Sequence, residues 1–310
     1  MARLHFPLVC ALLLVLAGCV PVKHAAVAPA FESADVSRIA IFRAAADGIT
    51  AGAFGQGGNL ELGQATLDTT LATLARSGAA LGVEIMPPRL DQYGLSEDEA
   101  ARAAVALRVA LVQAGLSYEE GERDSLDVAG DAGLLPMAAA SGTPYVAALQ
   151  TVAWRKTTGR RILDMGNGGP PHGIGLELAV VDARTGQPVW YGKRLTDFDP
   201  HEPENVRAMV DAMLFEMLTG RTVSASSFLP VPEGRPVSVS LYEGESASGP
   251  LKRREGFDLV IESDGAERRF PLQSVRLVRG FGERLFPSQV KDTIGQWRWS
   301  YRPSWGSTPL

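Results

Sequence analysis

The fold is encoded most clearly in residues 174–195, IGLELAVVDARTGQPVWYGKRL. Two runs rich in aliphatic and aromatic residues flank a polar turn, Ala183–Gln187, in which Gly186 can adopt a positive φ at no steric cost. Long apolar runs joined by such a turn are typical of a β-hairpin. We therefore predict two antiparallel strands, Ile174–Asp182 and Pro188–Leu195.

The turn and the strand that precedes it also favour a sheet. Asp182 and Thr185 carry oxygens that can accept hydrogen bonds from the turn backbone, and Trp190 has the bulk to pack on a half-buried sheet. Thr143–Arg155, TPYVAALQTVAWR, is rich in valine and aromatic residues. We therefore predict a third strand in this part of the chain.

Helical periodicity marks three longer segments around these strands. One of them starts with the S-x-x-E capping box of Ser96 and Glu99 and is apolar on almost every side up to Gly115, so we expect it to be well buried. The predicted elements, in chain order, are a strand at Ser37–Phe42, a flexible loop at Gly52–Gly58, a helix at Asn59–Ala80, a strand at Val83–Met86, the capped helix at Ser96–Gly115, a short helix at Ala129–Ala140 and a helix at Asp199–Gly220.

The pattern changes near Arg221, after which no segment of useful length has a helical period. Short alternating runs follow, and Ser263–Gly265 is predicted as a hairpin turn between two of them. These runs are Val237–Tyr242, Phe257–Glu262, Glu267–Leu272 and Val275–Arg279. The predicted fold class is therefore α+β, an α/β layered sheet with helices, followed by a small all-β domain.

The first twenty residues indicate where the protein resides. An apolar run from Leu8 to Gly18 has the length of a signal-peptide core and is too short to span a bilayer. It ends in Leu16-Ala17-Gly18-Cys19, which resembles the lipobox of bacterial lipoprotein precursors. The resemblance implies cleavage before Cys19, a diacylglycerol on its thiol and a fatty acid, such as palmitate, on the new amino terminus. An ordinary signal peptide with an incidental cysteine is the alternative.

Composition narrows the class of protein further. The 310 residues include only two cysteines, Cys10 and Cys19, which excludes a disulfide scaffold. The net charge of −5 gives no indication of nucleic-acid binding. Val20 stands where an Asp would resemble an inner-membrane retention signal, so we expect the periplasmic face of the outer membrane. The predicted segments are a signal peptide at 1–18, a tether at 19–35, an α/β domain at 36–222 and a small β domain at 223–310.

The order of elements behind a lipobox resembles a group of bacterial envelope proteins. Two segments carry the resemblance: Thr143–Val146, which leads into a strand, and Val181–Trp190, with its Val-Asp-x-x-Thr-Gly ending and the Trp that follows. The group includes the amino-terminal domain of the TolB periplasmic protein, the curli-secretion lipoprotein, the small lipoproteins that activate penicillin-binding proteins and related peptidoglycan-binding lipoproteins. The resemblance covers about residues 36–220 and implies binding of envelope components without catalysis.

No catalytic or metal site is recognisable in the sequence. Gly52–Gly58 lacks the Gly-Lys-Ser/Thr of a phosphate-binding loop, and His172 lies in a Gly-rich segment that reads as a solvated loop. One acidic cluster offers the oxygen ligands that a divalent cation takes, although two of its members also suit helix initiation. It consists of Asp197, Asp199, His201, Glu202 and Glu204. We expect no enzyme activity, no cofactor and no metal.

Two further features are candidate partner-binding sites. The basic runs Lys252–Arg254 and Arg268–Arg269 are either solvated faces of a hairpin or contacts for an anionic envelope polymer. The C-terminal aromatic residues either fill the core of the β domain or stack on the sugars of peptidoglycan or on a partner protein. They are Trp297, Trp299, Tyr301 and Trp305.

The sequence therefore predicts a non-catalytic outer-membrane lipoprotein whose periplasmic α/β domain binds another envelope component, a protein or peptidoglycan. Its expected partners are the membrane, through the lipid, and that component, with no nucleic acid. Two alternatives stay open. One is an accessory of a secretion or surface-assembly apparatus, in which a pore would need long alternating hairpins. The other is a cell-wall hydrolase.

Overall fold

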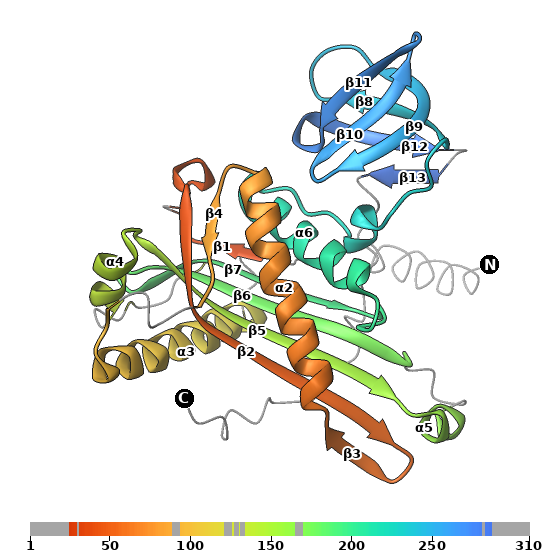
Figure 1. The fold of residues 1–310 in the computed structure, drawn as a ribbon. Coiled ribbons are helices and arrows are strands. Elements are labelled where there is room, and N and C mark those ends of the chain that lie inside the picture. The colour runs from red at the N-terminus through yellow and green to blue at the C-terminus, as the bar shows by residue number, and fades with distance from the viewer. Residues whose placement is uncertain are drawn as a thin grey trace, which may run out of the picture.

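The protein has an α+β fold followed by a second, all-β region (Figure 1). The structure is a computed structural model. It describes residues 25–29, 31–88, 94–120, 126, 130, 134–164, 170–280 and 283–286.

The first sheet has seven strands in the order β1-β7-β6-β5-β2-β3, with β4 also paired to β2. β2 and β5 are parallel, and the β5-β6-β7 ladder is antiparallel. The strands are β1 (Ala25–Val27), β2 (Arg38–Gly52), β3 (Gly55–Gly58), β4 (Glu84–Met86), β5 (Tyr145–Lys156), β6 (His172–Asp182) and β7 (Gln187–Thr196).

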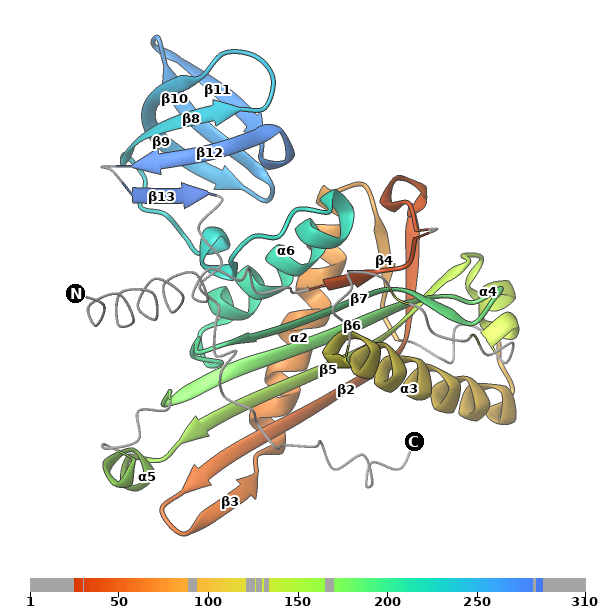
Figure 2. The ribbon, with the colours of Figure 1, turned by 180° about the vertical axis from the view of Figure 1, so that it is seen from behind.

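Helices cover both faces of this sheet. α2 (Leu60–Ala80) and α6 (Pro203–Thr219) pack on one face, and α3 (Glu97–Glu120) packs on the other (Figures 1 and 2). Two separate apolar cores result, because alternate residues of each strand point to opposite faces. The shorter helical elements are η1 (Ser33–Asp35), α4 (Leu135–Ser141) and α5 (Thr158–Leu163).

The predicted hairpin between β6 and β7 is confirmed. Asp182 lies opposite Gln187, and the Asp182 Oδ1 accepts a hydrogen bond from the Arg184 backbone N–H at 2.9 Å. Thr185 Oγ1 accepts from the Gln187 backbone N–H at 3.3 Å, and Gly186 has a φ of 72°. The turn residues therefore act as their chemistry predicts. Trp190, on β7, is fully buried in the core beneath α6.

We predict that replacing Asp182 by alanine lowers the free energy of unfolding by about 1–2 kcal/mol at pH 7. The Arg184 side chain and backbone N–H donate to this carboxylate and hold its pKa below the usual range. A lowered pKa in the folded state stabilises the protein above the ordinary carboxyl pKa of about 4, and this stabilisation disappears as the pH falls through the folded value. Urea unfolding at pH 7 and pH 3 should therefore show a smaller difference at pH 3. Asp197→Ala, at an exposed site, is the control.

A close helix–strand contact places α2 along β2. A methyl group on Gly48 would lie 1.9 Å from the Asn59 carbonyl oxygen, and one on Gly63 would lie 2.8 Å from the Gly48 backbone nitrogen. Asn59 also caps the helix, because its side chain accepts a hydrogen bond from the Leu62 N–H at 3.1 Å. Glycine is required at this crossing because the two backbones approach within the space of a side chain.

The second sheet has six strands in the order β11-β10-β9-β8-β12-β13. The predicted turn after β10 is confirmed, since Asp264 and Gly265 have φ values of 56° and 77°. β9 and β13 were missed by the sequence prediction. The strands are β8 (Pro236–Leu241), β9 (Ala247–Glu255), β10 (Asp258–Ser263), β11 (Ala266–Pro271), β12 (Val275–Gly280) and β13 (Glu283–Phe286).

A cluster of aromatic rings joins the second sheet to α6. The Phe215 ring centroid lies 5.8 Å from that of Phe228, 6.2 Å from that of Phe257 and 5.6 Å from that of Phe286. Phe228 belongs to the short helix η4 (Ala225–Phe228), which follows α6. One apolar core therefore continues from beneath α2 and α6 into the second sheet.

Two sequence predictions near the N-terminal part of the first sheet are wrong. The predicted tether is shorter than residues 19–35, because β1 pairs antiparallel with β7 and Ala26 is buried. Gly52–Gly58 is not a flexible loop, because it comprises the end of β2, the turn at Ala53 and Phe54, and the strand β3. The short strands β1 and β3 pair through their backbones and have no apolar periodicity. The sequence therefore carried no side-chain signal for them.

Candidate interaction surfaces

α3 exposes a continuous apolar row, which we call the α3 stripe. It consists of Val105, Val109, Val112 and Leu116, which are 62%, 43%, 36% and 51% exposed. Their spacing of four, three and four residues keeps them on one side of the helix. The opposite side is buried against the sheet and is built mainly from small residues, Ala103, Ala106, Leu107, Ala110, Leu111 and Ala114.

The expectation that this helix is buried all round is therefore wrong. Alanines let one side of α3 lie close to the sheet, and among the described residues nothing covers the other side. The helix also continues past Gly115, where a methyl group would lie 3.2 Å from the Tyr191 hydroxyl oxygen. Tyr118 packs on Tyr191 with ring centroids 5.5 Å apart. Glu97–Tyr118 is long and apolar enough to cross a membrane by length and composition, a test that core helices of globular proteins also pass.

The acidic residues of α3 lie at its two ends, and its two arginines, Arg102 and Arg108, lie between them. The predicted capping box is confirmed, because Ser96 Oγ accepts from the Glu99 N–H at 3.3 Å and the Glu99 carboxylate accepts from the Ser96 N–H at 2.9 Å. Glu97, Asp98 and Glu99 make the first turn acidic, and the helix ends in Glu119 and Glu120. The α3 stripe is therefore an apolar surface with acidic residues at both ends.

His172, which was predicted to lie in a solvated loop, is instead the first residue of β6, and it lies close to His201 at one end of the first sheet. His172 Nε2 is 4.0 Å from Asp199 Oδ2, and Arg155 Nη1 is 3.1 Å from His201 Nε2. Only Asp199 and His201 of the five residues in the predicted acidic cluster take part in these contacts. Among the residues that the structure describes, no group of three or more His, Cys, Asp or Glu side chains is placed to hold a metal ion.

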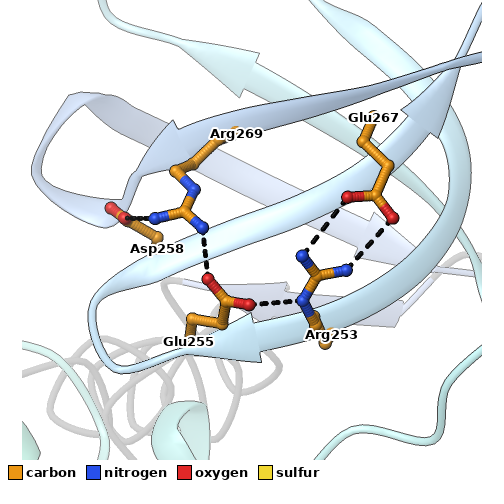
Figure 3. Close-up of polar contacts among 5 residues, drawn as sticks. All are labelled: Arg253, Glu255, Asp258, Glu267 and Arg269. Carbon is orange, nitrogen blue, oxygen red and sulfur yellow. Dashed lines mark hydrogen bonds and ion pairs between the residues drawn. The ribbon is translucent and has the colours of Figure 1, made fainter.

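The basic runs of the second sheet are paired with carboxylates (Figure 3). Arg253 bonds Glu255 and, at 3.1 and 3.2 Å, both oxygens of Glu267. Arg269 bonds Glu255 and, at 3.2 Å, Asp258. These ion pairs link neighbouring strands and offset the charge that an anionic polymer would need.

The other basic residues of these runs are also engaged. Lys252 pairs with Glu262, and Arg254 donates to the carbonyls of Ser227, at 2.9 Å, and Phe228. Arg268 lies over the Phe270 ring. The structure therefore favours the first of the two sequence interpretations, in which these residues stabilise a hairpin face.

The remaining sites predicted from the sequence lie outside the described residues. These are the lipid-attachment residue and the four C-terminal aromatic residues, namely Cys19, Trp297, Trp299, Tyr301 and Trp305. They stay predictions. Sequence reasoning missed the α3 stripe, although its four-three-four spacing is visible in the printed sequence.

Comparison with known proteins gives likenesses of structure only. No protein-family model matches the chain, and no curated protein matches it. A PelC dodecamer from Paraburkholderia phytofirmans is 12% identical, with 63% of this chain and 96% of that chain covered and a TM-score of 0.30.

Two further structures are similar at the same level. Lipoprotein GNA1162 from Neisseria meningitidis is 12% identical, with 60% of this chain and 99% of that chain covered and a TM-score of 0.27. The LpoB C-terminal domain from Salmonella enterica is 16% identical, with 55% and 87% covered and a TM-score of 0.20. With scores this low, the function of the chain has to be inferred from its own surfaces.

Proposed function

We propose that this chain is a non-catalytic lipoprotein, anchored through Cys19 in the outer membrane and facing the periplasm, that binds another envelope protein. The α3 stripe is the observation that carries the binding proposal. It presents four aliphatic side chains in one row on an otherwise regular helix, with nothing described covering them. Exposed contiguous apolar surface of this kind marks interaction sites.

The chemistry of the stripe favours a helix of a protein partner. Valine and leucine at four-three-four spacing form the ridge that a second helix takes into its groove. The stripe contains no aromatic ring on which a sugar could stack. Protein is therefore a better fit than peptidoglycan at this surface.

Charge at the helix ends indicates what kind of helix binds. Two copies of α3 packed side by side would bring acidic ends together in either orientation, because both Glu97–Glu99 and Glu119–Glu120 are acidic. Like charges in contact oppose such pairing. The complementary partner is an amphipathic helix with an apolar seam and basic residues near both of its ends.

The test is site-specific photocrosslinking in intact cells. A photoreactive residue at position 105, 109 or 112 should give one adduct with a second protein. The same residue at Asp68, on the exposed side of α2, should give none. Adducts with glycan, adducts of twice the chain's mass, or equal labelling at Asp68 would each contradict the proposal.

A single substitution gives a second measure. Val109→Asp should weaken partner binding by at least about tenfold, because a carboxylate would be buried in an apolar contact. Its melting temperature should stay within a few degrees of the wild type, since the side chain is already 43% exposed. Asp68→Ala should change neither quantity. Unchanged binding by Val109→Asp would show that the stripe is not the contact.

A further inference from the structure

A second exposed apolar surface lies at the end of the first sheet where β2 and β5 terminate. Phe54, in the β2–β3 turn, is fully exposed, and Ile162 and Leu163 of α5 are each 61% exposed. We call the β2–β3 turn and α5 together the sheet tip. The β2–β3 turn and the short helix α5 lie at the same end of the sheet (Figures 1 and 2).

The two parts of the sheet tip touch each other. The Thr157 N–H donates to the Ala51 carbonyl at 2.9 Å, which ties the start of α5 to the end of β2. A methyl group on Gly159 would lie 3.5 Å from the Ala53 Cβ, an ordinary van der Waals contact. The turn that carries Phe54 and the helix that carries Ile162 and Leu163 are therefore neighbours at this end of the sheet.

Positive charge accompanies these apolar side chains. The segment 155–164 contains four cations and one acid, namely Arg155, Lys156, Arg160, Arg161 and Asp164. Asp164 pairs with Lys156 at 2.7 Å and with Arg160 at 3.1 Å, and Arg161 is exposed. The acidic segment 197–204 borders this surface, because His201 contacts Arg155. The cations of α5, Arg160 and Arg161, lie further along the chain from that contact. The α5 side of the sheet tip is therefore basic.

The start of the folded chain is directed toward the same end of the sheet. Ala25 lies opposite Gly192 and Val27 opposite Trp190, so Ala25 is the end of β1 that lies nearer to the C-terminal end of β7. That end of β7, Thr196, pairs with Ile174, and Ile174 pairs with Ala153, three residues before β5 ends at Lys156. Five residues lie between Cys19 and Ala25, and the six steps from one Cα to the next span at most about 22 Å. A lipid on Cys19 would hold this end of the sheet near the bilayer.

We propose that the sheet tip is a membrane-contact surface, which inserts Phe54, Ile162 and Leu163 among the headgroups of anionic phospholipids. Protruding apolar side chains need a complementary pocket on a protein, whereas a bilayer accommodates them without one. An aromatic ring and basic residues beside aliphatic ones suit the interfacial layer of such a surface. The inference takes only the lipid at Cys19 from the proposed function and is independent of any partner of α3.

The first experiment measures the depth of the sheet tip in the lipid-anchored protein. A cysteine at position 54 carries an environment-sensitive fluorophore, and the full mature chain is reconstituted in vesicles of phosphatidylethanolamine and phosphatidylglycerol that contain nitroxide lipids. Quenching should be at least about threefold greater than for a label at the exposed Glu245 of the second region. Equal quenching at the two positions would overturn the proposal.

The second experiment separates the sheet tip from the anchor. The mature chain with Cys19→Ser is sedimented with the same vesicles, and the triple variant Phe54→Ser, Ile162→Ser, Leu163→Ser should bind about tenfold less. Leu135→Ser, at a 48% exposed apolar position on α4, should bind as the parent does. If the triple variant binds equally, the sheet tip makes no contact. Mass spectrometry of the native protein tests the lipid on Cys19 by itself, so a failure of the anchor is seen separately.

Discussion

Replacing Arg194 by methionine is expected to lower the free energy of unfolding by about 3–5 kcal/mol, because it leaves the Glu216 carboxylate buried without its cation. Both side chains are buried, and the Arg194 Nη2 lies 2.7 Å from Glu216 Oε2. Arg194 also donates to the carbonyls of Val223 at 2.9 Å and Ala212 at 3.3 Å. Methionine fills a similar space but offers no donor, so these groups lose their partner.

The position of this pair explains why the effect is large. Arg194 comes from β7 and Glu216 from α6, and Val223 belongs to the segment that leads to the second sheet. The Thr222 hydroxyl donates to the other Glu216 oxygen at 2.6 Å. One guanidinium therefore joins the sheet, the helix and the connection between the two regions.

The pH dependence of the free energy of unfolding provides a further check on this prediction. Burial raises the pKa of the Glu216 carboxyl, against the pull of Arg194. Removal of the cation raises this pKa further, so in the variant the protonated form is favoured at a higher pH. A raised carboxyl pKa in the folded state favours folding at low pH and loses that contribution as the pH rises. The deficit of Arg194→Met relative to the wild type should therefore be larger at pH 8 than at pH 5.

The neighbouring residue is the matched control. Lys193, one position along β7, pairs with Glu177 at 3.4 Å, and both side chains are about one-third exposed. Lys193→Met should change the free energy of unfolding by less than about 1 kcal/mol. The double variant Arg194→Met with Glu216→Leu should recover much of the loss. Urea unfolding that showed equal effects for the two methionine variants would contradict the prediction.

Local chemistry explains which parts of the fold were predictable. The β6–β7 hairpin and the α3 capping box are set by residues within a few positions of one another, such as Asp182 with Gly186 and Ser96 with Glu99. Helix α6 ends at Gly220, as predicted, because that residue adopts a φ of 66°. Signals of this kind can be read from one short window of sequence.

The elements that were missed depend on partners far away in the chain. β1 is recognisable only because it pairs with β7, and β3 because glycines pair with the end of β2. β9 reads as a polar loop and a basic run, but Leu251 within it is buried and Arg253 pairs with Glu267. Periodicity likewise shows that α3 is apolar on several sides and does not show which sides are covered.

The buried ion pair left a weaker signal in the sequence that could have been used. Glu216 interrupts the apolar run AMLFEML on α6. Arg194 shares the inward phase of β7 with Trp190, since alternate residues of a strand face the same side. A single acid and a single base at inward-facing positions indicate a buried pair, but only the folded structure shows that the two side chains touch.

Replacing Phe215 by alanine is expected to cost about 3–5 kcal/mol and to loosen the second sheet from the first. Phe215 is fully buried on α6 and meets Phe257 and Phe286 of the second region and Phe228 of η4. Loss of the ring opens a cavity where the two regions share one core. Phe270→Ala is the control, because Phe270 is buried on β11, at the edge of the second sheet.

Hydrogen exchange separates the two variants. In the wild type, amides of β5 and β6 and those of β10 and β12 should require the same opening free energy, because one core is continuous through both regions. Phe215→Ala should lower protection in the second sheet while β5 and β6 keep more of theirs, since the core beneath α3 is intact. Phe270→Ala should lower protection in β10 and β11 and leave α6 unchanged. If Phe215→Ala lowered the exchange protection of both sheets equally, the two regions would unfold as one unit even without the ring. The Arg194–Glu216 pair would then be the stronger connection between them.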